Sequence, residues 1–306
     1  MKNFNEIEKQ CLCSFEQAGP YWHVWTPENH PIVFPDEKSF IAGMNILAIC
    51  ARLSPEVKII TYELMTNHFH LTVEGRRDEV EKMVSIFIRA LFKYFKAQGM
   101  AVDLSGFTPS MREIKTLQDL RNVIVYNNRN GYIVSPDETP FSYKWGANTC
   151  YFNPAQKQLF AQSRASLSAR ERRFFARTHE ADTIEGIITV DGCACPMSFC
   201  AISFGESLFR GASHYFRELS RNIESQKTIA AEIGESIFYT DDELFSVVLR
   251  VCKEKYGQSS PGLLPAQAKR ELAALLHYDY NAGNKQIRRM LRLDPQIVAS
   301  LFPERH

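Results

Sequence analysis

Hydrophobic and polar positions follow two different periods along the first half of the chain. Runs rich in aromatic and β-branched residues predict strands at residues 21–26 and in two runs within 57–74, around the polar pair Thr66-Asn67. Apolar residues that recur every three to four positions predict helices over residues 40–53, 79–98 and 117–128. Ser54-Pro55 ends the first helix, Gly99 the second, and Gly131 is expected to stop the third. Residues 1–150 therefore read as a mixed α and β domain.

Two linker-like segments interrupt the pattern of strands and helices in the second half of the chain. Residues 135–154 are rich in Pro, Gly, Asn and Ser, and a domain boundary is expected there. Residues 259–262, Ser-Ser-Pro-Gly, predict a second linker. Between them the pattern is mostly helical, with an apolar interlude at 187–204 that is expected to pair as strands. The expected domains are therefore 1–150, a helical connecting region 151–258, and a tail 259–306.

Composition narrows the class of protein without identifying it. The chain has 306 residues, of which 45% are hydrophobic and 23% charged, as in ordinary folded proteins, and its net charge of +1 does not by itself indicate a nucleic-acid partner. The polar N-terminus MKNFNEIEKQ and the lack of an 18-residue apolar run predict no signal peptide, no membrane partner and a cytoplasmic location.

The sequence lacks the motifs of several common metal-binding and enzyme classes. Among the eight cysteines, Cys11-x-Cys13 and Cys193-x-Cys195 have no second pair at zinc-finger spacing, so reduced thiols are expected rather than a structural zinc site. The sequence contains no Gly-Lys-Ser/Thr phosphate loop, no Gly-x-Gly-x-x-Gly after a strand and no His-Glu-x-x-His. An enzyme that depends on ATP or NAD is therefore disfavoured.

His68 and His70 are the first candidates for chemistry. On a strand, residues two apart point to the same face, so the two imidazoles are expected side by side, with Phe69 and Leu71 facing the core. Neutral imidazoles bind divalent metals, and a bound metal can orient and polarise a phosphate. Because His-x-His is a short signal, two half-exposed strand histidines without a metal remain an alternative.

The surrounding sequence YELMTNHFHLTVE resembles the histidine segment of the single-tyrosine HUH transposases, the insertion-sequence-200-like and REP-associated families. Residues 21–40, 89–99 and 140–147 are similar to further family segments, so the resemblance covers about residues 18–147 in order. It implies an α+β fold, an antiparallel sheet with packed helices and the histidines on a central strand. It also implies Mg²⁺ or Mn²⁺ at His68 and His70, a homodimer, and cleavage and strand transfer of hairpin-forming single-stranded DNA through a 5′-phosphotyrosine link.

The nucleophile departs from the family pattern, in which Tyr and Asn lie four apart before a Gly. In RNVIVYNNRNGYIV, residues 121–134, the two possible alignments place Asn122 and Tyr126, or Val123 and Asn127, at those positions. Tyr126 and Asn130 recreate the pair one turn later, which makes Tyr126 the candidate nucleophile and Asn130 a candidate metal ligand. A phenol is a weak nucleophile unless a metal polarises the phosphate that it attacks.

Two alternatives to this assignment stay open. Tyr126 could instead be a buried structural tyrosine, and Tyr132 and Tyr143 are poorer nucleophiles because they follow the helix. The alternative function is a catalytically inactive, domesticated DNA-binding or regulatory protein on the same fold.

The tail predicts three short helices that resemble a helix-turn-helix unit and the DNA-binding end of the bacterial replication initiator. They run from Pro265 to Tyr280, from Lys285 to Leu293, and from Pro295 to Leu301 with Asp294 as N-cap. A basic face would contact the phosphates of duplex DNA and place the protein on the nucleoid. The candidate contact residues are Lys285, Arg288, Arg289, Arg292 and Gln296, while a solvated helical cap is the alternative.

Overall fold

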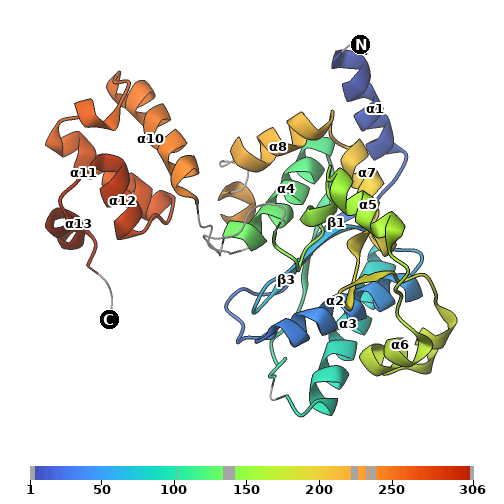
Figure 1. Ribbon diagram of the computed structural model, residues 1–306. Coiled ribbons are helices and arrows are strands. Elements are labelled where there is room, and N and C mark those ends of the chain that lie inside the picture. The colour runs from blue at the N-terminus through green and yellow to red at the C-terminus, as the bar shows by residue number, and fades with distance from the viewer. Residues whose placement is uncertain are drawn as a thin grey trace. The chain divides into compact units, whose positions relative to one another are not determined.

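The computed structural model describes residues 4–100, 102–133, 142–221, 227–231, 234 and 239–303 (Figure 1). The chain divides into two compact units, Met1–Leu219 and Ser220–His306. This division differs from the expected boundaries near 150 and 258, because the segment after residue 142 packs back on the first domain.

The first unit is built on a four-stranded antiparallel sheet, which confirms an α+β fold. Its strands are β1 (Tyr21–Trp25), β2 (Lys58–Leu64), β3 (Phe69–Glu74) and β4 (Ser110–Ile114), in the order β2-β3-β1-β4. Three of them follow the predicted runs; β4 was not predicted, because its sequence SMREI is polar and half-exposed. β3, which carries His70, is a central strand as expected.

One face of the sheet is covered by α2 (Glu37–Leu53) and α3 (Arg77–Ala97). Asp36 caps the start of α2, accepting a hydrogen bond from the backbone N–H of Ser39. The apolar stripe predicted for α3 is buried, and Phe87 packs edge-on against Phe69 of β3 with ring centroids 5.4 Å apart. Phe69 therefore faces an apolar core, as the alternation predicted.

The other face is covered by α4 (Leu117–Ile133), which lies across the sheet from α2 and α3 (Figure 1). The helix was expected over 117–128 with a stop near Gly131, and it runs two residues past this glycine, to Ile133. A glycine inside a helix costs only about 1 kcal/mol. Packing on the sheet exceeds this cost, since Asn127 and Asn128 bond Thr72 and Thr61 of the strands below.

Residues 142–219 complete the first unit instead of connecting two domains. The chain returns to the edge of β2, where the Leu64 N–H donates to Trp145 O and the Ala147 N–H to Tyr62 O. Further along, the predicted apolar interlude forms a two-stranded sheet, β5 (Thr189–Val190) with β6 (Cys193–Ala194), over part of its length. The remaining elements are α1 (Phe4–Glu16), η1 (Asn148–Cys150), α5 (Pro154–Gln162), α6 (Ala169–Ala176), η2 (His179–Thr183), η3 (Pro196–Ser198), α7 (Ile202–Ser207) and α8 (Ala212–Arg221).

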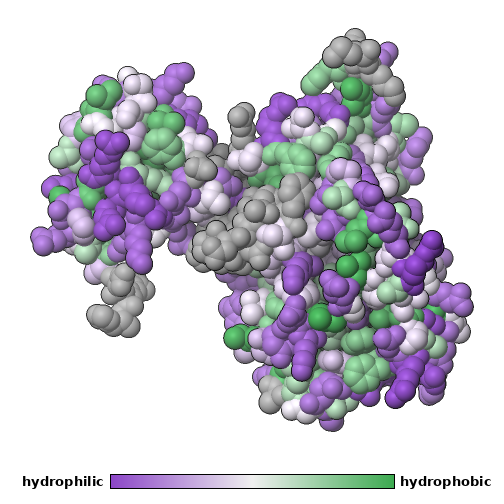
Figure 2. Space-filling view, viewed as in Figure 1, coloured by the Kyte–Doolittle hydropathy of each residue, from purple (hydrophilic) through white to green (hydrophobic). Residues whose placement is uncertain are grey.

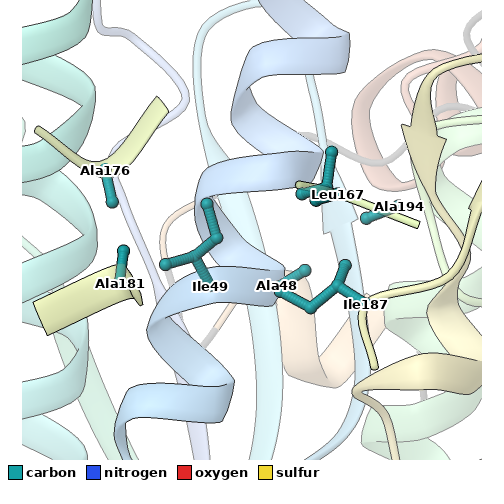
Figure 3. Packing of buried hydrophobic residues seen from close by; sticks show 7 residues of the cluster. All are labelled: Ala48, Ile49, Leu167, Ala176, Ala181, Ile187 and Ala194. Atoms are coloured by element: carbon teal, nitrogen blue, oxygen red, sulfur yellow. The ribbon is translucent and has the colours of Figure 1, made fainter. Parts of the chain in front are cut away.

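A second apolar core explains why these later residues belong to the sheet domain. Ala48 and Ile49 on the outer side of α2 pack with buried residues of the later segment (Figure 3). The partners are Leu167, Ala176, Ala181, Ile187 and Ala194. The outer side of α2 is thus covered by residues more than a hundred positions away, which no local sequence pattern could reveal.

The second unit contains the three helices predicted for the tail, observed as α11 (Ala266–Asp279), α12 (Asn284–Leu291) and α13 (Pro295–Leu301). It also contains α10 (Asp241–Tyr256), which precedes the predicted tail, and η4 (Pro261–Leu263). Asp294 caps α13, as predicted, by accepting from the Gln296 N–H. Ile287, Met290 and Leu291 of α12 are buried as expected, whereas α12 ends two residues early because Arg292 adopts a left-handed conformation. In the described parts of both units, no helix has the length and apolar character needed to cross a membrane.

Candidate active site on the histidine face

The sheet face beneath α4 gathers polar and ionisable side chains from three strands. Antiparallel pairing places Trp25 of β1 and Glu63 of β2 opposite His70 of β3, and places His23 and Thr61 opposite Thr72. Cross-strand partners share a face, so these residues form one polar layer, here called the histidine face. It is the face opposite to Phe69.

The histidines of this face contact one another. His68 and His70 lie with ring centroids 5.0 Å apart, which confirms that they share a side. His23 lies on the other flank of His70, with its Nε2 3.4 Å from His70 Nδ1 and the rings 5.5 Å apart. His70 and His23 are fully buried and His68 is 7% exposed. The expected half exposure is therefore wrong, whereas the binding of a metal stays a prediction. Tyr126 of α4 packs on the rings of His70 and His23.

Tyr126 of α4 is the side chain that meets these imidazoles from above. Its ring packs edge-on against His70, with centroids 5.6 Å apart, and against His23 at 6.1 Å. The hydroxyl-bearing ring is 1% exposed. The structure thus places Tyr126, the predicted nucleophile, against His70 of the predicted histidine pair. The alignments to the family motif had not put Tyr126 at the nucleophile position. At this burial, no ligand could touch the Tyr126 side chain unless α4 shifted.

The amide that accompanies Tyr126 on this face is Asn127. Its Nδ2 donates to Thr72 Oγ1 at 2.9 Å, while its fully buried Oδ1 has no hydrogen-bond partner among the described residues. Asn130, the predicted metal ligand, is half-buried one turn further along α4. Within the described chain, no bond or ring contact joins Asn130 to either histidine. Asn127, which one family alignment had placed at the amide position, faces the strands through its bond to Thr72.

The two imidazoles of His68 and His70 are chemically able to bind a divalent ion, but they are not a complete site. No group of three or more His, Cys, Asp and Glu side chains in the described residues could hold a metal ion. His68 and His70, with ring centroids 5.0 Å apart, offer two imidazole nitrogens, and further ligands would have to complete the coordination. A buried acceptor without a partner costs about 1–3 kcal/mol, which a bound cation would offset.

Sequence reasoning missed two members of the site, His23 and Glu63. Both lie on strands that the sequence predicted, but nothing local shows which strand lies beside β3. Glu63 is 1% exposed and next to His70 across the strands. Tyr143, a poorer nucleophile candidate, donates its hydroxyl to Leu64 O at 2.6 Å, which gives it a structural role. The side chain of Tyr132 lies outside the described residues.

The predicted DNA-contacting residues of the tail lie on the surface of the second unit. Lys285, Arg288, Arg289, Arg292 and Gln296 are all exposed. Hydrophilic side chains gather over α12 in the view of Figure 2. Arg289 forms an ion pair with Asp241, with 2.7 Å between Nη2 and Oδ2, so its charge is partly neutralised. The other three basic residues have no ion pair within the described chain.

Comparisons of the chain with family models, with curated proteins and with solved structures find no match in any of the three. The resemblance of residues 18–147 to the HUH transposases therefore stays a prediction, and the site is interpreted from its own geometry.

Proposed function

We propose that this protein cleaves and rejoins hairpin-forming single-stranded DNA through Tyr126, in the manner of an HUH single-tyrosine transposase. The observation that carries the proposal is the packing of Tyr126 of α4 on His70 and His23, which lie on the two central strands β3 and β1. The HUH fold, the homodimer and the nucleoid location belong to the same proposal.

Each side chain has a defined part in the proposed reaction. His68, His70 and the Asn127 Oδ1 would hold Mg²⁺ or Mn²⁺, which when bound supplies charge stabilisation to the phosphate. Tyr126 Oη forms a bond to phosphorus, the bond from phosphorus to the 3′ oxygen breaks, and the DNA 5′ end stays on the tyrosine. His23, beside the phenol, accepts the proton that Tyr126 loses.

A labelled-DNA experiment tests this proposal. A pool of hairpins with randomised loops and flanks is incubated with Mn²⁺ and the full chain, and covalent adducts are resolved on a denaturing gel. We expect a Mn²⁺-dependent adduct that Tyr126→Phe abolishes and that His68→Ala/His70→Ala reduces at least about a hundredfold. Tyr62→Phe is the matched control, since it removes one buried hydroxyl, bonded to Met44, from the opposite face of the sheet.

A second candidate is a DNA-binding or regulatory protein that makes no covalent link. The burial of Tyr126 favours it, because a phosphate has no path to a side chain that is 1% exposed unless α4 moves. Retention of hairpins from the pool without any adduct, in Mn²⁺ and in Mg²⁺, would select this function and reject strand transfer.

The tail is proposed to bind duplex DNA in either case. We expect Arg288→Ala/Arg292→Ala to weaken duplex binding about tenfold and to lower the slope of log affinity against log salt by about 2. Arg289→Ala is the control, and a smaller loss is expected because Asp241 already offsets its charge. Equal losses in both variants would contradict a phosphate-contacting face centred on Arg288 and Arg292.

A further inference from the structure

The surface of the first unit over α3 and α6 carries exposed cations and exposed aromatic rings. In the second half of α3, exposed residues lie at helical spacing on one side of the helix: Arg89, Phe92, Lys93 and Lys96. No Asp or Glu lies between Glu81 and Asp103 in the sequence. This side of α3 is therefore positively charged.

Aromatic contacts join α6 to the same part of α3, and the two helices lie next to each other in Figure 1. The Tyr94 ring of α3 packs against Phe174 and Phe175 of α6, with ring centroids 5.6 and 5.7 Å apart. Arg170 lies one turn before Phe174, and the guanidinium of Arg177 lies over the Phe174 ring, 5.0 Å from its centroid. The residues that carry charge or an exposed ring here are called the α3/α6 surface: Arg89, Phe92, Lys93, Lys96, Arg170, Phe174 and Arg177.

The cations of the α3/α6 surface are not held by acidic side chains. Within the described part of the chain, none of its Lys and Arg side chains forms an ion pair. Glu171 of α6 accepts bonds from Ser168 in the helix cap. Asp182 pairs with a different arginine, Arg173, at 2.9 Å. Because the whole chain has a net charge of only +1, this surface is a local concentration of positive charge.

The exposed rings of this surface each lie beneath one of the cations. Phe92 is 49% exposed and Phe174 is 42% exposed. Lys96 Nζ lies 6.0 Å from the centroid of the Phe92 ring, as Arg177 does at 5.0 Å from Phe174. Such a pair matches one nucleotide of a single strand, whose base stacks on the ring or on the guanidinium plane and whose phosphate carries the negative charge. In a duplex the bases stack on each other, so these rings fit unpaired bases.

We propose that the α3/α6 surface binds single-stranded nucleic acid, with phosphates at the cations and unpaired bases at Phe92 and Phe174. Binding is expected to tolerate any sequence, because every base has a π-face. A negatively charged lipid surface fits less well, since a ring beneath a cation enters the apolar part of a bilayer only together with that charge. The proposal does not depend on strand transfer, because α3 covers the Phe69 face of the sheet, opposite to the histidine face.

Fluorescence anisotropy with a labelled thymidine oligonucleotide of about 12 residues tests the cations in the full chain. EDTA is present, so the metal-dependent reaction proposed for Tyr126 does not contribute. We expect Lys93→Gln/Lys96→Gln/Arg170→Gln to weaken binding at least about tenfold and to lower the slope of log affinity against log salt by about 2. Failure of the wild-type chain to bind the oligonucleotide would overturn this proposal, while adduct formation on hairpins would still test Tyr126 separately.

The matched control removes the same charge from exposed cations that already have acidic partners. Lys58→Gln/Arg76→Gln/Lys115→Gln replaces side chains paired with Glu74, Asp78 and Glu113. We expect it to change the affinity for the oligonucleotide less than about threefold. Equal losses in the two triple variants would overturn a site on the α3/α6 surface.

The rings are tested by a change that keeps their apolar character. Phe92→Leu/Phe174→Leu is expected to weaken oligonucleotide binding at least about fivefold with the salt slope unchanged, because stacking is lost and charge is not. A duplex of the same length should bind this variant as it binds the wild type. Vesicles of phosphatidylcholine and phosphatidylserine provide the lipid arm. Unchanged oligonucleotide affinity, or loss of vesicle binding in place of oligonucleotide binding, would overturn the proposal.

Discussion

The two faces of the central sheet are both buried, but they are stabilised by different interactions. On one face, Phe69 packs among aromatic rings beneath α3, and burial of apolar area supplies the stability. On the histidine face, α4 covers His70, His23 and Glu63, which are costly to bury unless their polar groups are satisfied. A protein that needed only stability would gain little from this second arrangement. This contrast is what the function proposed for the histidine face would require.

The largest effect on the free energy of unfolding is expected from a substitution on the apolar face. Phe69 is fully buried between Phe87 and Phe107, so Phe69→Ala is expected to lower the free energy of unfolding by about 3–5 kcal/mol in urea denaturation. Phe92→Ala, at a position 49% exposed, is the matched control and is expected to cost under about 1 kcal/mol. Equal losses would show that the apolar face is not the main source of stability.

The next effect concerns a buried histidine outside both sheet faces and is measured as a function of pH. His214 of α8 lies near Arg121 of α4; burial, then Arg210 and Arg121, lower its pKa to about 4. Its Nδ1 accepts a hydrogen bond from the Arg210 N–H, which protonation would break. The unfolded chain binds this proton below about pH 6.5, whereas the folded chain binds it only near pH 4. The contribution of His214 to the free energy of unfolding is therefore constant above pH 6.5. It is expected to fall by about 3 kcal/mol at most between pH 6.5 and 4.

His214→Gln should flatten this pH dependence in thermal unfolding from pH 4 to 7. His179→Gln, at a side chain 89% exposed, should leave it unchanged. An unaltered slope in His214→Gln would assign the pH dependence to other groups.

A smaller effect concerns the polar contacts of the histidine face. Thr72→Val removes the acceptor of the Asn127 amide while conserving volume, and is expected to cost about 1–3 kcal/mol. Adding Asn127→Leu should recover part of the lost free energy of unfolding, because it removes the buried amide that Thr72→Val leaves without an acceptor. Thr66→Val, at an exposed position, is the control. Full additivity of the two histidine-face substitutions would contradict the coupling.

Sequence predicted the elements that depend on local periodicity and caps, and failed where long-range packing decides. The strands β1, β2 and β3, the helices α2 and α3, and the Asp294 cap were predicted from such patterns. α1 was not predicted, because its polar sequence depends on an ion pair between Glu8 and Arg121, which lie 113 residues apart. The helix α4 passes Gly131 because the sheet holds it.

The candidate site divides in the same way. The side-by-side placement of His68 and His70 follows from strand alternation, whereas the neighbours His23 and Glu63 depend on strand order. The burial of Tyr126 depends on where α4 docks. A motif alignment assigns positions along a helix, but only the docked helix shows that Asn127 faces the strands.

The most direct measurement of the central claim is peptide mapping of the covalent product. The full chain is incubated with the hairpin pool and Mn²⁺, digested with nuclease and protease, and analysed by mass spectrometry for nucleotides on tyrosine. The account predicts a 5′-phosphotyrosyl nucleotide on Tyr126, absent from Tyr126→Phe, with unfolding free energies that differ by under about 1.5 kcal/mol between the two proteins. Nucleotide on another tyrosine, or hairpins bound with every tyrosine unmodified, would contradict it.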